Sequence, residues 1–412
     1  MKETFLFFLF FTAFGCIFLI YSSSDESTIP TPWTLTNLTK FIQIFKSDEK
    51  NQSKKDITWR GKDGNESILN SIDISCSTDN LEKLKAFKFD LSPIQKEIEQ
   101  SDDRCKYYVE KFDFRLESSS DEELNYPLAY GILAYHDFVQ LMLMLSSFYE
   151  PQNEYCISIP FNAESSFRHL LNEIPHCFSN IHIIQTEETS WGNFEIIRSV
   201  HSCLVFLDQL STQWKYYQYL SGVDLPLKTN LEMVRIFQKL NGSPIAEVSR
   251  FQGMRLKGKS LTSPPLPLFK SSMSALIPRG AADRICSNPI AFDLLHFLKG
   301  TDIPDEGLWA TVLGNPNKFP LPKQWNASAI LEFRKSRRTD YRKLNENEAP
   351  ELVAHKFYLD TQPAAFFCIL KELERRRKNP DKNFHYERYS RIPQVELANG
   401  IPFDKLTYPQ LV

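Results

Sequence analysis

Two adjacent acids, Asp305 and Glu306, follow a proline and begin an amphipathic run in the stretch PDEGLWATVL. Proline fixes its own φ and disfavours helix in the residue before it, so the pattern predicts a loop that delivers a carboxylate at a helix start. Such a carboxylate can act as a general base toward a hydroxyl group. Acids in a first helical turn also have an ordinary structural role, because they complement the helix dipole and cap free N–H groups.

The composition is globular and gives no support for binding to nucleic acid. The chain has 412 residues, of which 42% are hydrophobic and 24% charged, with a net charge of −3. Proteins that bind DNA or RNA usually carry a basic face, so neutral partners are favoured here. The length suits one large domain or two ordinary ones.

The N-terminus carries a signal for the secretory pathway. After a cytoplasmic tail of residues 1–4, residues 5–21 form an uncharged, mostly apolar run that serines and acids then end. A helix of this length spans roughly 25 Å, the lower limit for a bilayer, so we expect a signal anchor with the rest of the chain in the lumen. A cleaved signal peptide is the alternative, because Ser22–Ser24 could serve as a cleavage site.

Other features agree with a lumenal, oxidising compartment. Seven cysteines lie outside the apolar run, which contains one of the chain's 8, so at least one of the seven is free or pairs between chains. No Cys/His spacing suggests zinc and no two aspartates are two residues apart, so we expect no metal site. Glycosylation sequons begin at Asn37, Asn51, Asn65 and Asn326.

The chain divides into a polar stem at residues 22–83, a mixed and charged N-terminal lumenal region at 84–125, and an ordered domain at 126–412. Strands are predicted at 128–135, 155–159, 181–185 and 216–220, and helices at 138–148, 163–172 and 193–210. Alternation of this kind predicts an α/β domain with a mostly parallel sheet, whose ligand site lies at the carboxyl ends of the strands.

Four segments, in order along the chain, resemble those of the core 2/I-branching β-1,6-N-acetylglucosaminyltransferases (glycosyltransferase family 14). They are AYHDFVQLMLMLSSFYEPQNEYCISI from Ala134, WKYYQYLSGVDLPLKTNLEMV from Trp214, PDEGLWATVL from Pro304, and LVAHKFYLDTQPAAFFCILKEL from Leu352. The likeness extends from about Leu128 to Arg377.

This resemblance implies a GT-A-type domain with a Rossmann-like sheet, in a single-pass type II protein of the Golgi membrane. The implied reaction is inverting and needs no metal or other cofactor: N-acetylglucosamine passes from UDP-GlcNAc to a hydroxyl of an O-linked glycan on a glycoprotein, in a β-1,6 linkage. The related peptide xylosyltransferases share parts of these motifs, so transfer of xylose to a peptide or glycan is an alternative.

The resemblance also implies roles for residues that bind the donor and carry the reaction. Glu306 takes the position of the catalytic base, and Lys356, in the segment AHKF, takes that of the phosphate-binding lysine. The family's phosphate-binding arginine has three candidates here, with Arg338 ranked slightly above Arg334 and Arg337. Basic side chains of this kind would stabilise the departing diphosphate.

On the acceptor side, Glu247 follows the turn LNGS much as the family's sugar-binding glutamate follows its own turn. The basic run Arg255–Lys259 could add hydrogen bonds to a sugar or could form a solvated loop. Asp224 and Lys228, in SGVDLPLKT, could line the acceptor site or stabilise a turn through backbone hydrogen bonds.

The sequence departs from the family pattern in two places. Ser158-Ile159-Pro160 stands where the family has His-Val-Asp, so a carboxylate near the base and ribose of the nucleotide is missing. The segment between Trp325 and Lys356 is shorter than in the family and lacks its cysteine. These departures motivate a further alternative, a catalytically inactive relative that binds glycans.

Overall fold

The computed structural model describes residues 67–77, 81–259, 263–336, 351–361, 363–382 and 384–407. The expected anchor, most of the expected stem and the candidate Arg338 lie outside these ranges, as do the sequons at Asn37, Asn51 and Asn65. Within the ranges, no helix combines the length and the apolar character that a membrane span requires.

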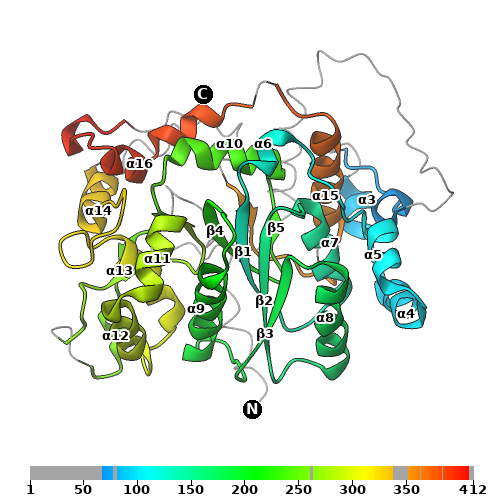
Figure 1. Cartoon of the computed structure of the whole chain (residues 1–412), viewed down its shortest axis with the longest axis horizontal. Helices are drawn as coiled ribbons and strands as arrows, with labels where there is room; N and C mark the ends of the chain where they lie inside the picture. Colours follow the sequence, from blue (N-terminus) through cyan, green and yellow to red (C-terminus); the bar gives the residue numbers. More distant parts are fainter. Residues whose placement is uncertain are drawn as a thin grey trace.

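A six-stranded sheet in the order β3-β2-β1-β4-β9-β6 lies at the centre of the domain (Figure 1). Its strands are β1 (Leu128–Leu133), β2 (Glu154–Pro160), β3 (Ile181–Thr186), β4 (Tyr216–Ser221), β6 (Ile245–Ala246) and β9 (Ala275–Pro278). The first four are parallel, and β9 runs antiparallel to both β4 and β6. The prediction of a mostly parallel sheet is therefore confirmed.

Helices pack on both faces of this sheet and enclose two hydrophobic cores. The first core includes side chains of α7 (Phe138–Phe148), α8 (Ser165–Cys177), α10 (Asn230–Leu240) and α15 (Pro363–Lys378). The second includes those of α9 (Phe194–Gln209), α11 (Arg279–Ser287), α12 (Pro289–Leu298), α13 (Trp309–Leu313) and α14 (Ala327–Ser336). The described helices continue to α16 (Pro393–Ala398).

Short helices before β1 form a layer beside α7, α8 and α15 (Figure 1). They are α2 (Ile68–Ser71), α3 (Leu81–Ala86), α4 (Ser92–Gln100) and α5 (Arg104–Phe112), and they are followed by α6 (Asp121–Leu124), which packs against α10. Their apolar side chains, Tyr108 among them, belong to the first core. Residues 67–77 and 81–83 of the expected stem thus lie in this layer.

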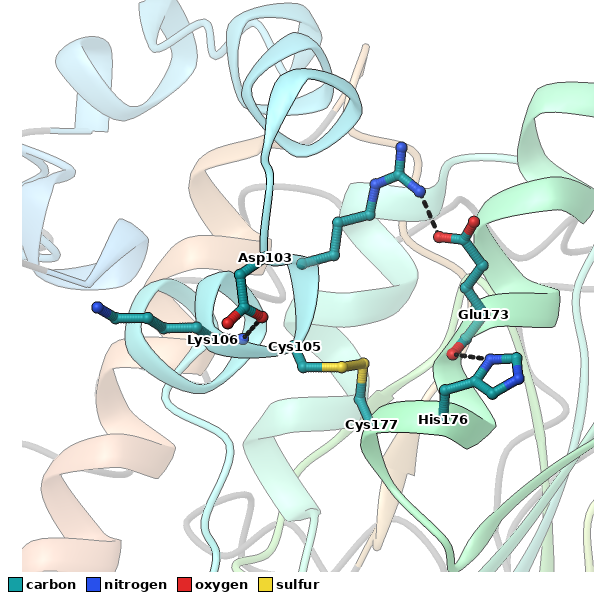
Figure 2. Close-up of a disulfide and its surroundings, with 7 residues drawn as sticks. Asp103, Cys105, Lys106, Glu173, His176 and Cys177 are labelled. Carbon is teal, nitrogen blue, oxygen red and sulfur yellow. Dashed lines mark hydrogen bonds and ion pairs between the residues drawn. A yellow bond between two sulfur atoms is a disulfide. The ribbon is translucent and has the colours of Figure 1, made fainter.

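Two disulfides fasten this layer to the sheet domain. Cys76 is bonded to Cys368 of α15, and Cys105 of α5 to Cys177 of α8. Figure 2 shows the second bond, with an ion pair between Arg104 and Glu173 beside it. Such bonds stabilise a domain mainly by restricting its unfolded chain.

The third disulfide joins Cys156 of β2 to Cys203 of α9. Cys286 has no disulfide partner within the described part of the chain. Three pairs and one remaining thiol agree with the odd count of cysteines outside the apolar run.

The order of the parallel strands reverses between β1 and β4, and in sheets of this kind the ligand crevice lies there, outside the carboxyl ends of the strands. The chain passes from β1 to β2 and β3 on one side, and β4 then returns to pair with β1 on the other. Here the flanking segments are Ala134–Asp137 after β1 and Gly222–Asp224 after β4.

Candidate active site

The PDEG stretch forms a single 3-10 turn, η4 (Pro304–Gly307), directly before α13. The backbone N–H of Ser271 donates to the Glu306 carbonyl at 2.8 Å, which fixes the turn. A Cβ at Gly307 would lie 2.7 Å from Cδ2 of Leu298, so any larger residue would force that side chain to shift. The prediction of a loop that presents a carboxylate at a helix start is confirmed.

Ile303, just before this turn, has a left-handed backbone with φ of 48°. A β-branched residue rarely adopts this conformation, which is strained for it. The proline after Ile303 also disfavours the right-handed helical alternative. Strain of this kind persists where the surrounding structure enforces it.

Two cations hold the carboxylate of Glu306. Arg255 forms an ion pair with it, and Nζ of Lys270 lies 3.5 Å from Oε2. The Glu306 side chain is 20% exposed, so it remains open to an incoming molecule. A general base that takes a proton from a substrate needs both a fixed position and access for that substrate.

The basic run Arg255–Lys259 is anchored by several contacts, although the Lys257 side chain is 57% exposed. Asp302 donates its backbone N–H to the Arg255 carbonyl at 2.7 Å and pairs with Lys257 at 2.6 Å. Lys259 donates to the carbonyl of Phe297 at 2.7 Å. These contacts hold the run against the segment that leads into Glu306.

Asp305 is the second acid of the turn, and only 9% of it is exposed. Its Oδ1 accepts no hydrogen bond from the part of the chain that the structure describes. Burial, reinforced by the carboxylate of Glu306, raises the pKa of Asp305 to about 7, against the opposing effects of Arg255 and Lys356. Lys356 therefore lies within electrostatic reach of this turn.

Glu247 belongs to the same group of charges. Burial raises its pKa, Lys270 and Arg334 oppose that effect, and Glu306 adds to it. Arg334 also donates to the carbonyl of Val248. The structure thus places Arg334 beside the candidate acceptor residue Glu247.

Asp224 lies in the crevice between β1 and β4 and is 1% exposed. It accepts hydrogen bonds from the backbone N–H of Ser221 at 2.7 Å and from its hydroxyl at 2.8 Å. Nδ1 of His355 lies 2.5 Å from Oδ1 of Asp224. The turn-stabilising alternative for Asp224 is therefore what the structure shows, with a histidine added.

Lys228 is buried away from the Glu306 cluster. It lies over the ring of Phe384 at 5.4 Å, close to Arg376 and Glu232. Burial, together with the guanidinium of Arg376, lowers the pKa of Lys228 to about 8. Glu306 has Arg255 and Lys270 as its cations. Glu232 instead lies near Lys228 and Arg376, and these residues are called the group around Glu232.

The remaining predictions concern the sequon at Asn326 and metal-binding groups. Asn326 is exposed at the start of α14, where its Oδ1 accepts from the N–H of Ala329 at 3.2 Å. In the described ranges, no group of three His, Cys, Asp or Glu side chains is placed to hold a metal ion.

Sequence reasoning assigned no role to Asp305, Lys270 or His355. Lys270 carries no local signal, because it meets Glu306 from β8 (Phe269–Lys270), thirty-six positions earlier in the chain. His355 had a signal, its position next to Lys356 in AHKF. Only the fold reveals that Asp224 lies opposite it.

Comparison with known proteins agrees with this architecture. Residues 128–331 match the family model described as Core-2/I-Branching enzyme, a range that contains Asp224, Glu247 and Glu306. Two relatives, from Bos taurus and Homo sapiens, are named beta-1,3-galactosyl-O-glycosyl-glycoprotein beta-1,6-N-acetylglucosaminyltransferase. Each is 30% identical over 227 residues, which cover 50% of this chain and 53% of the relative.

A third relative, from Mus musculus, is named N-acetyllactosaminide beta-1,6-N-acetylglucosaminyl-transferase. It is 26% identical over 250 residues, or 54% of this chain and 62% of the relative. The chain spans about half the length of the first two curated relatives it matches. The matched range, the parallel sheet and the position of the PDE turn lead to one conclusion: residues 128–331 form a domain of the core-2/I-branching enzyme family.

Proposed function

We propose that this protein is an inverting glycosyltransferase that moves N-acetylglucosamine from UDP-GlcNAc to a hydroxyl of an O-linked glycan, in a β-1,6 linkage. The observation that carries the proposal is the carboxylate of Glu306, held by Arg255 and Lys270 yet partly exposed, inside the matched domain. The names of the relatives support the donor and the linkage.

In the proposed reaction, Glu306 accepts the proton of the acceptor hydroxyl. The hydroxyl oxygen then attacks the anomeric carbon from the face opposite the diphosphate, and the bond between that carbon and the diphosphate oxygen breaks. UDP leaves, the configuration inverts, and the proton remains on Glu306 until water removes it. Arg255 and Lys270 fix the direction in which the carboxylate points, which is the main requirement for a positioned base.

Lys356 would stabilise the negative charge that develops on the departing diphosphate. Its electrostatic contact with Asp305 supports a position next to the base. Arg338 remains a second candidate for this task. Arg334, beside Glu247, is better placed to act on the acceptor side. Basic side chains of this kind would make a metal unnecessary.

Glu247 would accept hydrogen bonds from acceptor hydroxyls, because it shares Lys270 with Glu306 and lies near the base. Asp224 would act indirectly, through the turn after β4. Lys228 would contribute to folding rather than to binding, since its neighbours are Phe384 and Arg376.

The proposal includes a Golgi enzyme anchored by residues 5–21, with its domain in the lumen and carrying N-glycans. Three disulfides support an oxidising compartment. Asn326 is exposed, as a glycosylation site must be.

The test is UDP release by the full chain from UDP-GlcNAc and from UDP-xylose, in EDTA, with mucin-type acceptors. We expect acceptor-dependent release from UDP-GlcNAc that persists in EDTA and falls by about 10²- to 10⁴-fold in Glu306→Gln, the usual contribution of a general base. The control is Glu372→Gln, which changes a similar carboxylate on α15, outside the site.

Each other result has a definite meaning. Release only from UDP-xylose would replace the donor and keep the mechanism. Release that EDTA abolishes would reject the metal-free reaction. No release from either donor, together with no binding of UDP, would favour an inactive glycan-binding relative, for which Pro160 at the end of β2 is the structural argument.

A further inference from the structure

A buried carboxylate and a histidine face each other in the crevice between β1 and β4, and the proposed reaction leaves this pair unused. Asp224 comes from the turn after β4, and His355 from the segment that leads into Lys356. The side chain of His355 is 13% exposed, so the ring is largely desolvated but can still be reached.

The backbone around His355 is fixed on both sides. β10 (Val353–Ala354) pairs with β5 (Leu225–Pro226), directly after Asp224. The N–H of Phe357 donates to the Val223 carbonyl at 2.7 Å. Nε2 of Gln140 donates to the Phe357 carbonyl at 3.0 Å. The imidazole therefore has a set position relative to the end of β4.

The pairing also determines what the second ring nitrogen can do. Nδ1 of His355 is engaged by Asp224, and Nε2 has no hydrogen-bond partner among the residues described. A histidine whose one nitrogen faces a carboxylate is held in orientation, and in its cationic form the other nitrogen is an N–H donor. Such a donor forms strong, charge-assisted hydrogen bonds to phosphate oxygens.

We propose that His355, oriented by Asp224, is a donor-binding residue that donates a hydrogen bond from Nε2 to the diphosphate of the nucleotide sugar, next to Lys356. This inference rests on the proposed function, because it requires a nucleotide in the crevice. It adds a binding residue, and it gives Asp224 a positioning role.

The affinity for a diphosphate should then depend on pH. When the neutral ring keeps its proton on Nδ1, Nε2 has a lone pair in place of an N–H group, so UDP binding should weaken when the ring loses its charge. The titratable or charged groups near the pair are Asp224 itself, Lys356, and Tyr358, whose hydroxyl is near Asp224, Asp360 and Tyr135. Burial and Asp224 raise the pKa of Tyr358, so its hydroxyl stays protonated near neutral pH.

The test measures binding of UDP and of uridine to the full chain by calorimetry at pH 6.0, 7.0 and 8.0. His355→Asn keeps a donor for Asp224 and removes the second nitrogen, whereas His355→Gln places an uncharged donor near the position of Nε2. The matched control is His182→Asn, because His182 pairs with Glu154 at 2.8 Å outside the crevice. Thermal unfolding of each variant establishes that it is folded.

At pH 6.0 we expect His355→Asn to weaken UDP binding by about tenfold, the usual worth of one charge-assisted hydrogen bond. His355→Gln should lose less, both should lose the wild-type decrease between pH 6.0 and 8.0, and uridine binding should not change. Wild-type affinity and pH dependence in His355→Asn, or an equal loss for uridine, would overturn the inference. Absence of UDP binding by the wild-type chain would instead reject the proposed function.

Discussion

The group around Glu306 and the group around Glu232 use the same residue types in different ways. Arg376 on α15 pairs with Glu232 at 2.5 Å and donates to the Leu227 carbonyl at 2.7 Å. Glu232 in turn completes the capping box of α10, because its carboxylate accepts from the N–H of Thr229 at 2.9 Å. The two contacts of Arg376 thus join α15 to α10 and to the segment just before it.

The group around Glu306 is more exposed and contains a strained residue. Asp305 has an oxygen without a hydrogen bond in the described structure, and Ile303 has a left-handed backbone. Glu306 is 20% exposed, whereas the Arg376 side chain is 6% exposed. Paired charges alone therefore do not indicate a site; strain and access distinguish a group that can receive a ligand from one that stabilises a fold.

The largest effect that would test this contrast is on stability. Arg376→Met should lower the free energy of unfolding by about 3–5 kcal/mol, because it leaves Glu232 buried without its cation. Activity per folded molecule should stay within about threefold, since a fold-stabilising group acts on folding rather than on the reaction. Urea unfolding and UDP release measure the two quantities. A large loss of activity with unchanged stability would contradict the claim that the group around Glu232 stabilises the fold.

The second prediction is an increase in the free energy of unfolding. Because the pKa of Asp305 is about 7 in the folded protein and lower in the unfolded chain, its contribution to stability is lost as the pH rises from about 4 to 7. Asp305→Asn should therefore raise the free energy of unfolding at pH 8, on the order of 2–4 kcal/mol, with a smaller gain at pH 5, where about a third of the contribution has been lost. Urea titrations at both pH values check this. Equal stability of both proteins at pH 8 would show that Asp305 is not destabilising.

The smallest expected effect concerns the strained turn. Ile303→Asn should raise stability by roughly 1 kcal/mol, because asparagine accepts a left-handed backbone far better than isoleucine does. Thermal unfolding is the measurement, and Asp113→Asn, at another left-handed position, is the matched control with no expected gain. A loss of stability in Ile303→Asn would mean that packing of the isoleucine outweighs its strain.

The central elements could be predicted from sequence, because long apolar segments have a readable period. The helix predicted at 138–148 coincides with α7, and β1, β3 and β4 differ from prediction by a residue or two at their ends. Helix α8 begins at Ser165 and ends at Cys177, later at both ends than predicted, and its last turn contains Pro175. Boundaries are the least predictable feature of an element.

Contacts between distant segments could not be predicted. β5 and β10 are two residues long and exist only because their segments meet in the fold. Arg255 and Glu306 are both visible in the sequence as charged residues, yet their pairing depends on how two loops fold together. Lys228 shows the reverse case, because a motif position predicted to lie near the site is buried beside Phe384 and Arg376.

The bond between Cys76 and Cys368 has a consequence for proteolysis. It closes a ring of 292 positions that contains the whole sheet and the Glu306 turn. A protease that cuts the backbone once inside this ring leaves one covalent molecule, whose fragments separate only after reduction. A cut before Cys76 releases the ring intact from everything upstream. Release of the intact ring from the segment upstream therefore requires cleavage before Cys76.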